Sequence, residues 1–340
     1  MAKILAIRFS ALGDVAMAVP VLYSFAKAYP QHQLVVLSRS AMAPLFAYAP
    51  SNLLFKGVDL KKDHKGLKGI LRLYSELRKE KFDAVADLHD VLRSKVLRLC
   101  FCADGVRVRH INKGRRAKYR LVSGKFKTPL KSSFCRYLET FEHLGYPFTL
   151  RFSSIFEFAP APELLEDWIG EKGEDKWIGI APFAAHKGKI YPLSLHREVV
   201  GRLSAIGGMR MFLFGGGDEE KKVLDAWEKE FPHVTSVVGR LRMQEELALM
   251  SKLDVMLAMD SGNMHLASLV GVPVVSVWGA THPYAGFMGW NQAEENVVQL
   301  DLPCRPCSIY GNKPCRWGDY RCLTGILPEV IVGRIRVLTE

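Results

Sequence analysis

The stretch DSGNMHLASLVGVPVVSVWG, residues 260–279, decides the fold. An apolar run at 255–259 precedes it and predicts a buried strand, and residues 274–278 predict the next strand. Between them, apolar residues within 264–270 predict a short helix that Gly271 and Pro273 end. The unit is therefore strand, tight turn, helix, strand. Its turn carries an acid, a hydroxyl, a glycine and then a histidine.

Strands alternate with helices along the whole chain. We expect strands at 3–9, 34–38, 84–88, 177–181, 211–214 and near Val237, and helices at 14–29, 66–80, 193–206, 243–252 and 328–339. Such alternation predicts parallel sheets flanked by helices, the α/β class. The pattern restarts after the acidic, Pro-containing stretch 157–176, so we expect two doubly wound domains joined near residue 160.

The composition is that of a soluble globular protein. The chain has 340 residues, of which 49% are hydrophobic and 24% are charged, enough for two full cores. No apolar run approaches the roughly 18 residues that a membrane span needs, and the N-terminus MAKILAIRFS predicts a strand rather than a signal peptide. We therefore expect a cytoplasmic protein.

The formal charge of +12 is unevenly spread. Residues 1–160 hold 28 Lys and Arg against 12 Asp and Glu, whereas the remainder holds 19 against 23. The densest basic run is RVRHINKGRRAKYRLVSGKFK, residues 107–127. A basic half indicates an anionic partner, which nucleic acid, a phosphorylated glycan or an anionic membrane surface would supply; a solvated loop is the alternative.

Seven cysteines are present. We expect Cys100, Cys102 and Cys135 to act as small hydrophobic residues. The other four form C-x2-C-x7-C-x6-C, at Cys304, Cys307, Cys315 and Cys322. Four thiols so close together could hold zinc, but the second pair lacks the short spacing of a zinc ribbon. We expect reduced, packed thiols ahead of a structural metal.

Ligands of doubly wound sheets bind outside the carboxyl ends of strands, and two of the turns there carry suitable residues. FSALGD, residues 9–14, has the single glycine Gly13, so it is not the G-x-G-x-x-G of a dinucleotide site. Asp14 either caps the following helix or holds a carboxylate at the edge of a cleft. In PFAAHKGKIYP, residues 182–192, Lys187 and Lys189 suit a phosphate, and solvated lysines are the alternative.

The turn of the opening stretch is the third. Ser261 and Gly262 lie where the amides of a helix N-terminus favour an anion. Asp260 at the strand's end could accept hydrogen bonds from sugar hydroxyls, and His265, one helical turn on, could donate to a phosphate. Each residue alone has a structural explanation, but three polar groups converging on one turn indicate a site.

Four blocks together resemble the heptosyltransferase family, glycosyltransferase family nine. They are DSGNMHLA with GVPVVSVWGATHP, the N-terminal IRFSALGDV, KIYP at 189–192 and FGGGDEE at 214–220. The cysteine cluster is similar to that of many members, and the blocks span nearly the whole chain. Relatives often have Ser or Thr before the conserved lysine, where this chain has Ala184 and Ala185, so donor affinity or identity could differ.

The resemblance implies a GT-B fold, two Rossmann-like domains facing across a cleft. Residues 1–160 would form the acceptor-binding domain and residues 161–325 the nucleotide-sugar-binding domain. Residues 326–340 would form a helix that packs back on the first domain. The implied activity is inverting transfer of heptose from ADP-heptose to a lipopolysaccharide inner-core acceptor, an anionic glycolipid.

The resemblance also assigns roles to residues. Asp14 would be the catalytic base. The remaining assignments concern the two substrates: donor binding by Gly13, Lys189, Asp218, Glu219, Asp260, Ser261, Gly262 and His265, and acceptor binding by the basic residues Arg115, Arg116, Lys118 and Arg120. No Asp-x-Asp occurs in the chain, so we expect no divalent metal and no cofactor.

The implied location is the cytoplasmic face of the inner membrane, with peripheral contact to its anionic surface. Two alternatives stay open. Another GT-B enzyme, with a different nucleotide-sugar or a 2-epimerase activity, would not need the basic half. A nucleic-acid-binding protein would explain the charge but not the DSG and KIYP turns, so we expect no nucleic-acid partner.

Overall fold

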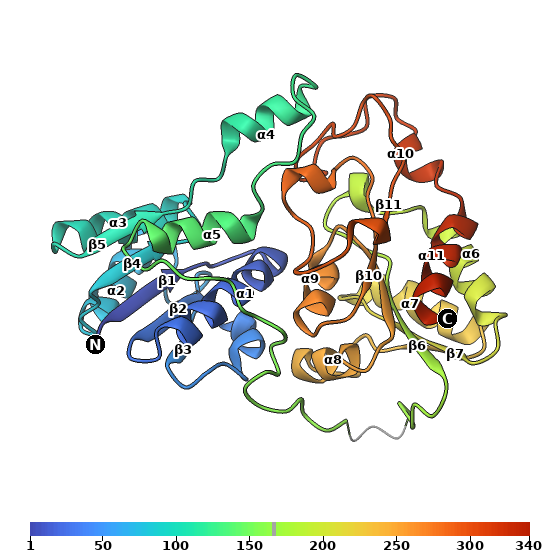
Figure 1. Cartoon of the computed structure of the whole chain (residues 1–340), viewed down its shortest axis with the longest axis horizontal. Helices are drawn as coiled ribbons and strands as arrows, with labels where there is room; N and C mark the ends of the chain where they lie inside the picture. The colour runs from blue at the N-terminus through green and yellow to red at the C-terminus, as the bar shows by residue number, and fades with distance from the viewer. Residues whose placement is uncertain (165–167) are drawn as a thin grey trace. The chain divides into compact units, whose positions relative to one another are not determined.

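The computed structural model describes residues 1–164 and 168–340, and its strands and helices alternate along the chain (Figure 1). Backbone contacts divide the chain into two compact units. One comprises Met1–Lys113 and Lys131–Pro160, and the other Gly114–Leu130 and Ala161–Glu340. The division at 160 lies in the linker expected at 157–176, of which residues 165–167 are outside the described part. The segment Gly114–Leu130 groups with the second unit, not with the basic first half.

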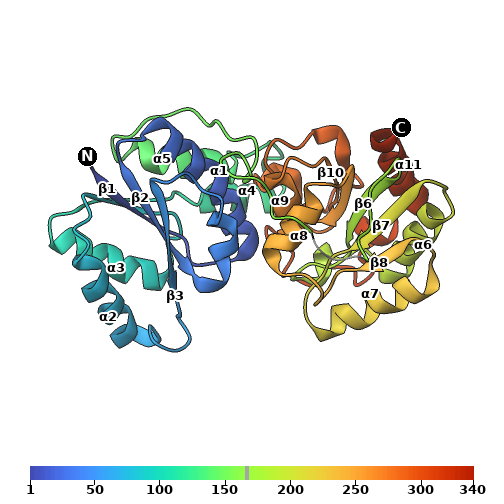
Figure 2. The same cartoon turned by 90° about the horizontal axis from the view of Figure 1, so that it is seen from below.

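The elements of the first unit alternate regularly. They are β1 (Lys3–Ile7), α1 (Leu12–Ala28), β2 (Gln33–Arg39), η1 (Ser40–Phe46), β3 (Leu53–Val58), α2 (Gly66–Arg78), β4 (Ala84–Asp87), α3 (Leu92–Ala103), β5 (Arg107–His110) and α5 (Ser133–Glu142). The strands form a parallel sheet of order β3-β2-β1-β4-β5. Helices α1 and α5 pack together on one face, and α2 and α3 pack together on the other (Figure 2).

The second unit repeats this plan. Its elements are α4 (Arg115–Val122), β6 (Lys176–Ala181), η2 (Lys187–Lys189), α6 (Leu193–Ser204), β7 (Met209–Leu213), α7 (Asp218–Glu230), β8 (Val234–Ser236), α8 (Met243–Met250), β9 (Val255–Met259), α9 (Gly262–Leu269), β10 (Val274–Val277), η3 (Pro283–Ala285), η4 (Glu294–Asn296), β11 (Val297–Val298), α10 (Arg321–Thr324) and α11 (Pro328–Thr339). The parallel sheet has the order β11-β10-β9-β6-β7-β8.

Burial on both faces explains why the strands are so apolar. In β1 and β2 nearly every residue is buried, because helices cover both sides of the sheet. In the second unit, side chains from β6, β7, β9 and β10 meet α6, α7 and α11 in one core, whereas α8 and α9 lie on the other face (Figure 2). The predicted α/β class with two doubly wound parallel sheets is confirmed.

Most elements predicted from the sequence are present with ends shifted by a few residues. The strand expected near Val237 is β8, which ends just before that residue. The sequence pattern does not predict the strands β3, β5 and β11 or the helices α3, α4, α5, α7 and α10. Within residues 1–164 and 168–340, none of the helices combines the length and the apolar composition that a bilayer span requires.

The terminal helix differs from the expectation that it packs on the first domain. Helix α11 packs along α6 and belongs to the second unit. Its buried side chains, Ile331 and Ile335, are fully enclosed in the core of that unit. The apolar side of this amphipathic helix is therefore buried in the core of the second unit.

The core of the second unit contains a histidine, a titratable side chain, that makes no hydrogen bond among the described residues. His196 on α6 is completely buried, with its ring near those of Tyr191 (5.7 Å between centroids) and Trp227 (6.0 Å). Neither ring nitrogen has a hydrogen-bond partner among the described residues. Burial lowers the pKa of His196 to about 3, so the imidazole is neutral in the folded protein.

His196 makes the stability of this unit sensitive to acid. In the unfolded chain a histidine titrates near pH 6.5, so between pH 6.5 and about 3 only the unfolded state takes up this proton. The free energy of unfolding should therefore fall by about 1.4 kcal/mol per pH unit from this residue as the pH drops through that window. Urea denaturation of His196→Leu should show a correspondingly shallower pH dependence. The variant His143→Gln, at an exposed histidine, should follow the wild type; equal slopes in all three proteins would contradict the assignment.

Candidate functional site

Asp14 lies after β1, where the strand order of the first sheet changes direction. Its carboxylate Oδ2 is 2.5 Å from the Arg8 guanidinium and accepts the Ala11 backbone N–H at 3.3 Å. The Tyr137 hydroxyl donates to the Asp14 carbonyl oxygen at 3.2 Å. The side chain is still 36% exposed. Asp14 is therefore held on one side and open to solvent on the other.

Arg8 anchors this arrangement from within the core. It is 6% exposed, and Nη1 donates to the Leu88 carbonyl oxygen at 2.8 Å. Burial acts to lower the pKa of Arg8, but Tyr137, Asp14 and Asp87 outweigh burial and the pKa lies above its usual value. The guanidinium is therefore permanently charged, and it gives Asp14 a fixed counter-ion at the start of α1.

A second group at this place was missed by the sequence analysis. His89 follows β4, the strand beside β1, and its Nδ1 accepts the Phe9 backbone N–H at 3.3 Å. Burial, helped by Arg8 and Lys113, lowers the pKa of His89 to about 3. A neutral imidazole therefore lies in the electrostatic environment of Asp14. The DLHD run at 87–90, a polar cluster at the end of an apolar strand, was the signal that could have found it.

Asp87 organises the same loop. Its Oδ1 accepts the backbone N–H groups of His89 and Asp90, both at 2.9 Å, and Arg98 lies 3.3 Å from Oδ2. The residue is completely buried. Because its carboxylate is satisfied by these three donors, Asp87 shapes the loop after β4 rather than offering a group to a ligand.

In the second unit, Lys189 and Asp260 form an ion pair at the corresponding place. Lys189 Nζ is 3.0 Å from Asp260 Oδ2, and their side chains are 16% and 5% exposed. Lys189 follows β6 and Asp260 follows β9, and these neighbouring strands flank the point where the second sheet changes direction. The sequence predicts separate roles for the two residues, Lys189 at a phosphate and Asp260 at sugar hydroxyls, whereas the structure brings them together.

The loops around Lys189 are packed backbone against backbone. A Cβ placed on Gly279 would lie 2.6 Å from the Gly188 carbonyl oxygen, and one on Gly311 would lie 2.4 Å from Lys189 Cγ. The Ala280 N–H donates to the Gly188 carbonyl oxygen at 2.8 Å. Only glycine fits such approaches, so the position of Lys189 is set by main chain.

Arg305 fastens one of these loops. It is 4% exposed, and its guanidinium donates to the carbonyl oxygens of Gly279 (2.5 Å) and Thr281 (2.8 Å). It also donates to Gln299 Oε1 at 3.0 Å. Burial is the main cause that lowers the pKa of Arg305. The role of this arginine is to hold backbone, since its donors are used by carbonyl groups of the same unit.

The remaining residues of the 260–265 turn lie as the sequence analysis expected. Helix α9 begins at Gly262 with Ser261 as its N-cap, and His265 is 5% exposed one turn into the helix. The buried hydroxyls of Ser261 and Thr281 have no hydrogen-bond partner within the part of the chain that the structure describes. The first amides of a helix also lack partners in the helix itself. Hydrogen-bonding groups for an anion therefore gather beside Lys189.

Asp218 and Glu219 are exposed in the first turn of α7, after β7. Glu219 pairs with Lys222 at 2.7 Å. The acid that turns inward is their neighbour Glu220, whose Oε2 accepts the Gly216 N–H at 2.8 Å. The FGGGDEE turn thus offers two solvated carboxylates and one that fastens the glycine loop.

The four basic residues expected to bind an acceptor divide into two kinds. Arg115, Arg116 and Arg120 are exposed on α4. Lys118 is buried, because its ammonium lies over the Phe287 ring, 4.3 Å from the centroid. A cation over an aromatic face is stabilised there. Lys118 therefore packs α4 against its own unit instead of facing solvent with the arginines.

The cysteines are free thiols with different surroundings. Cys322 is buried, and burial raises its pKa to about 11, so it is protonated. Cys304 is exposed, and Cys307 and Cys315 are half-buried. Among the described residues, no three His, Cys, Asp or Glu side chains are arranged to hold a metal ion.

The first three cysteines were predicted to act as small hydrophobic residues, and their surroundings differ. Cys100 is half-buried, but Cys102 on α3 and Cys135 on α5 are exposed. Both lie on solvent-facing positions of their helices, so they do not pack in the core as small hydrophobic residues do.

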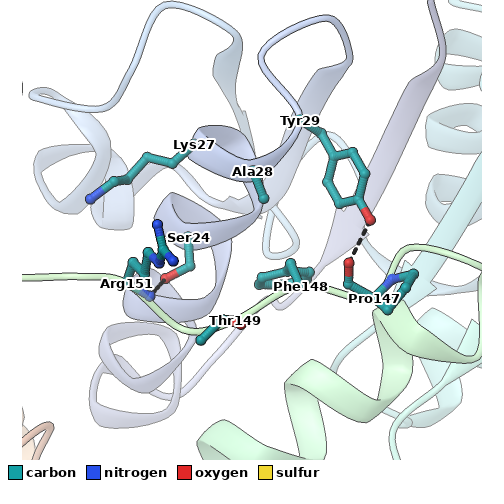
Figure 3. Close-up of a pocket in the computed structure, with 8 residues that line it drawn as sticks. All are labelled: Ser24, Lys27, Ala28, Tyr29, Pro147, Phe148, Thr149 and Arg151. Carbon is teal, nitrogen blue, oxygen red and sulfur yellow. Dashed lines mark hydrogen bonds between the residues drawn. The ribbon is translucent and has the colours of Figure 1, made fainter.

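A cavity of about 400 Å³ lies elsewhere in the first unit (Figure 3). It is lined by the last turn of α1 and by residues 147–151. The Tyr29 hydroxyl donates to the Pro147 carbonyl oxygen at 2.6 Å, and the Arg151 N–H donates to Ser24 Oγ at 2.8 Å (Figure 3). At 1.5 Å per residue, the length of α1 separates this cavity from Asp14 by about 20 Å. It is not part of the site after β1.

Comparisons with known proteins identify the family of the chain. The sequence profile described as "Glycosyltransferase family 9 (heptosyltransferase)" matches residues 70–317. Lipooligosaccharide heptosyltransferase 2 of Campylobacter jejuni is 22% identical over 96% of both chains.

Two solved structures share the fold. The Escherichia coli heptosyltransferase WaaC with ADP has a TM-score of 0.71, 17% identity and 99% coverage of both chains. The family 9 glycosyl transferase from Veillonella parvula has a TM-score of 0.74 and 18% identity, with 99% of this chain and 97% of that one covered. The fold is that of a GT-B glycosyltransferase, as predicted. The chain belongs to glycosyltransferase family 9, the heptosyltransferase family.

The Lys189–Asp260 pair should be detectable as a coupling in stability. Lys189→Met leaves the Asp260 carboxylate buried without its counter-ion, which costs about 3 kcal/mol or more. The double variant Lys189→Met/Asp260→Asn removes both charges, so it should recover most of that loss in urea denaturation. Lys187→Met is the matched control, because Lys187 in the same loop is exposed. Additive losses in the double variant would show that the pair is not coupled.

Proposed function

We propose that this enzyme transfers heptose from ADP-heptose to a lipopolysaccharide inner-core acceptor, with inversion at the anomeric carbon. The observation that carries the proposal is the pairing of sites. Asp14 lies at the switch point of the first sheet, and the Lys189–Asp260 pair with the α9 N-terminus lies at the switch point of the second. Family membership and the donors and acceptors named for its relatives support the same assignment.

The proposed base is Asp14. Its carboxylate removes the proton from the acceptor hydroxyl as that oxygen attacks the anomeric carbon. The ion pair with Arg8 and the Ala11 N–H fix the carboxylate, and its open side leaves room for a hydroxyl. The new bond forms opposite the departing diphosphate, and the bond from the anomeric carbon to the phosphate oxygen breaks. Because the hydroxyl attacks the face opposite the leaving group, the configuration at the anomeric carbon is inverted.

The proposed leaving-group site is the turn after β9. Departure of ADP places negative charge on the diphosphate, which the Lys189 ammonium, the amides at Ser261 and Gly262 and the His265 imidazole stabilise. Asp260 accepts hydrogen bonds from hydroxyls of the donor. Gly13 leaves room for the donor at the start of α1, and the exposed Asp218 and Glu219 reach its ribose or base. Lys189 carries a charge that a metal ion would otherwise supply, so we propose that transfer needs no divalent ion.

The proposed acceptor contacts are Arg115, Arg116 and Arg120. Lipid A and inner-core sugars carry phosphates and carboxylates. Exposed guanidinium groups bind such anions through bidentate hydrogen bonds. Because the acceptor is a membrane glycolipid, the enzyme would work at the cytoplasmic face of the inner membrane with peripheral contact to it. Lys118, which is buried, is left out of this set.

Nucleotide preference tests the donor assignment. Calorimetry with ADP, UDP, GDP and CDP in EDTA should show selective binding of ADP. His265→Ala and Lys189→Ala should each weaken ADP binding by about tenfold or more, since each removes a charged or polar contact worth at least about 1.4 kcal/mol. Lys187→Ala should leave ADP binding near the wild-type value. Preference for another nucleotide would move the donor assignment, and a strict need for a divalent ion would overturn the metal-free mechanism.

Asp14 can be tested separately from binding. Asp14→Asn keeps the size of the side chain but cannot accept the proton, so transfer should fall by a factor of about 100 or more. Binding of ADP in EDTA should be unchanged. Asp63→Asn, at an exposed loop carboxylate of the same unit, is the control and should retain full transfer. Normal turnover by Asp14→Asn would remove this residue from the role of base.

A further inference from the structure

The segment Gly114–Leu130 is strongly basic. It contains six Lys and Arg and no Asp or Glu. In the sequence it follows β5 of the first unit, but its backbone contacts group it with the second unit. Three of its arginines are proposed acceptor contacts, and its exposed aromatic residues have no role in that proposal.

Contacts on one side fix this segment in place. The Lys118 ammonium lies over the rings of Phe287 (4.3 Å) and Tyr310 (5.7 Å). The Leu130 N–H donates to the Tyr284 carbonyl oxygen at 2.9 Å. Helix α4 therefore has a defined inner face, on which Lys118 and Leu121 are buried.

The opposite face of α4 is turned to solvent. Arg115, Arg116, Tyr119, Arg120 and Ser123 are exposed, at the spacing of one helical face. The Tyr119 side chain is 70% exposed. Three cations and a large aromatic ring thus share a single surface.

The chain after α4 extends this surface. Phe126 is 49% exposed, and the Arg120 guanidinium lies 5.0 Å from the centroid of its ring. Lys125 and Lys127 flank Phe126 in the sequence and are exposed, and Lys127 forms an ion pair with Asp301 at 2.5 Å. We call the exposed residues of α4 together with Lys125–Lys127 the basic–aromatic face.

Such a face matches the chemistry of a bilayer surface. Anionic headgroups attract each Lys or Arg near the surface. Aromatic rings with a polar or cationic partner lie favourably at the boundary between headgroups and acyl chains. Exposed rings that have no core to join are costly in water, and insertion at this boundary removes them from it.

We propose that the basic–aromatic face docks the enzyme on an anionic lipid bilayer, with Tyr119 and Phe126 inserted between headgroups. The inference rests on the proposed function in one respect: a glycolipid acceptor makes a bilayer the surface that the enzyme must meet. It goes beyond that function by placing the docking on the unit that contains the Lys189–Asp260 pair. Nucleic acid could also stack on exposed rings, and the test below separates the two.

Vesicle sedimentation of the full chain tests this proposal. Vesicles of phosphatidylglycerol and phosphatidylcholine should bind the wild type, and vesicles of phosphatidylcholine alone should bind it much less. Tyr119→Ser/Phe126→Ser should lower the partition coefficient on the anionic vesicles by about tenfold or more, because two rings no longer insert. The matched control is Leu92→Ser/Leu99→Ser, which removes two leucines of α3 that are 79% and 68% exposed; it should bind as the wild type does.

Other results would overturn the proposal. Unchanged partitioning of Tyr119→Ser/Phe126→Ser would mean that charge alone adsorbs the protein. Tighter binding to duplex DNA than to the anionic vesicles would assign the face to nucleic acid. Calorimetry with ADP on the same variants keeps the two proposals apart: normal ADP binding without vesicle binding by the wild type overturns the docking surface alone. Vesicle binding without ADP binding overturns the donor assignment and leaves the surface standing.

Discussion

In a parallel sheet, every strand delivers its carboxyl end to the same edge, and a change of direction in the strand order opens a gap between two neighbouring loops. Both sheets of this enzyme obey the same order. In the first, the chain moves outward from β1 through β2 and β3 and returns to place β4 on the other side; in the second, β6 and β9 take the corresponding positions. Asp14 and His89 follow one such pair of strands, and Lys189 and Asp260 follow the other. Topology therefore fixes where these side chains gather, whatever their chemistry.

Each unit then uses a buried arginine to make that position rigid. Arg8 connects the loops after β1 and β4, since it binds Asp14 and the Leu88 carbonyl oxygen. Arg305 connects the loop after β10 with the region around residue 300, through the Gly279 and Thr281 carbonyl oxygens and Gln299. Burying a guanidinium is costly unless hydrogen-bond acceptors meet its donors. The loops that present the functional groups supply acceptors for both terminal nitrogens of Arg8 and for Arg305, although Arg8 Nε has no partner among the described residues, so loop geometry and core stability depend on one another.

The sequence predicted what depends on local pattern and missed what depends on contacts between distant segments. Apolar strands and the DSG turn were identified because periodicity and helix-start signals are local. The burial of Lys118 depends on Phe287, far along the chain, and the neutral state of His89 depends on its burial and on Arg8, which follows β1. Helix α11 shows an apolar stripe in the sequence, but the pattern does not say which surface receives it. The roles of individual site residues likewise follow from chemistry at the substrate, beyond what either pattern or fold specifies.

The ion pair between Lys189 and Asp260 has a consequence for selectivity among ligands. An anion that draws the ammonium away leaves the carboxylate buried with an uncompensated charge, which is unfavourable. A ligand that donates hydroxyl hydrogen bonds to Asp260 while its phosphates bind Lys189 replaces the contact that each residue loses when the ion pair opens. Binding therefore depends on both residues together. A molecule that carries phosphate and sugar on one framework binds more tightly than the separate affinities of its phosphate and sugar fragments predict. Free phosphate, which is abundant in any cell, meets a site that is already neutralised from within.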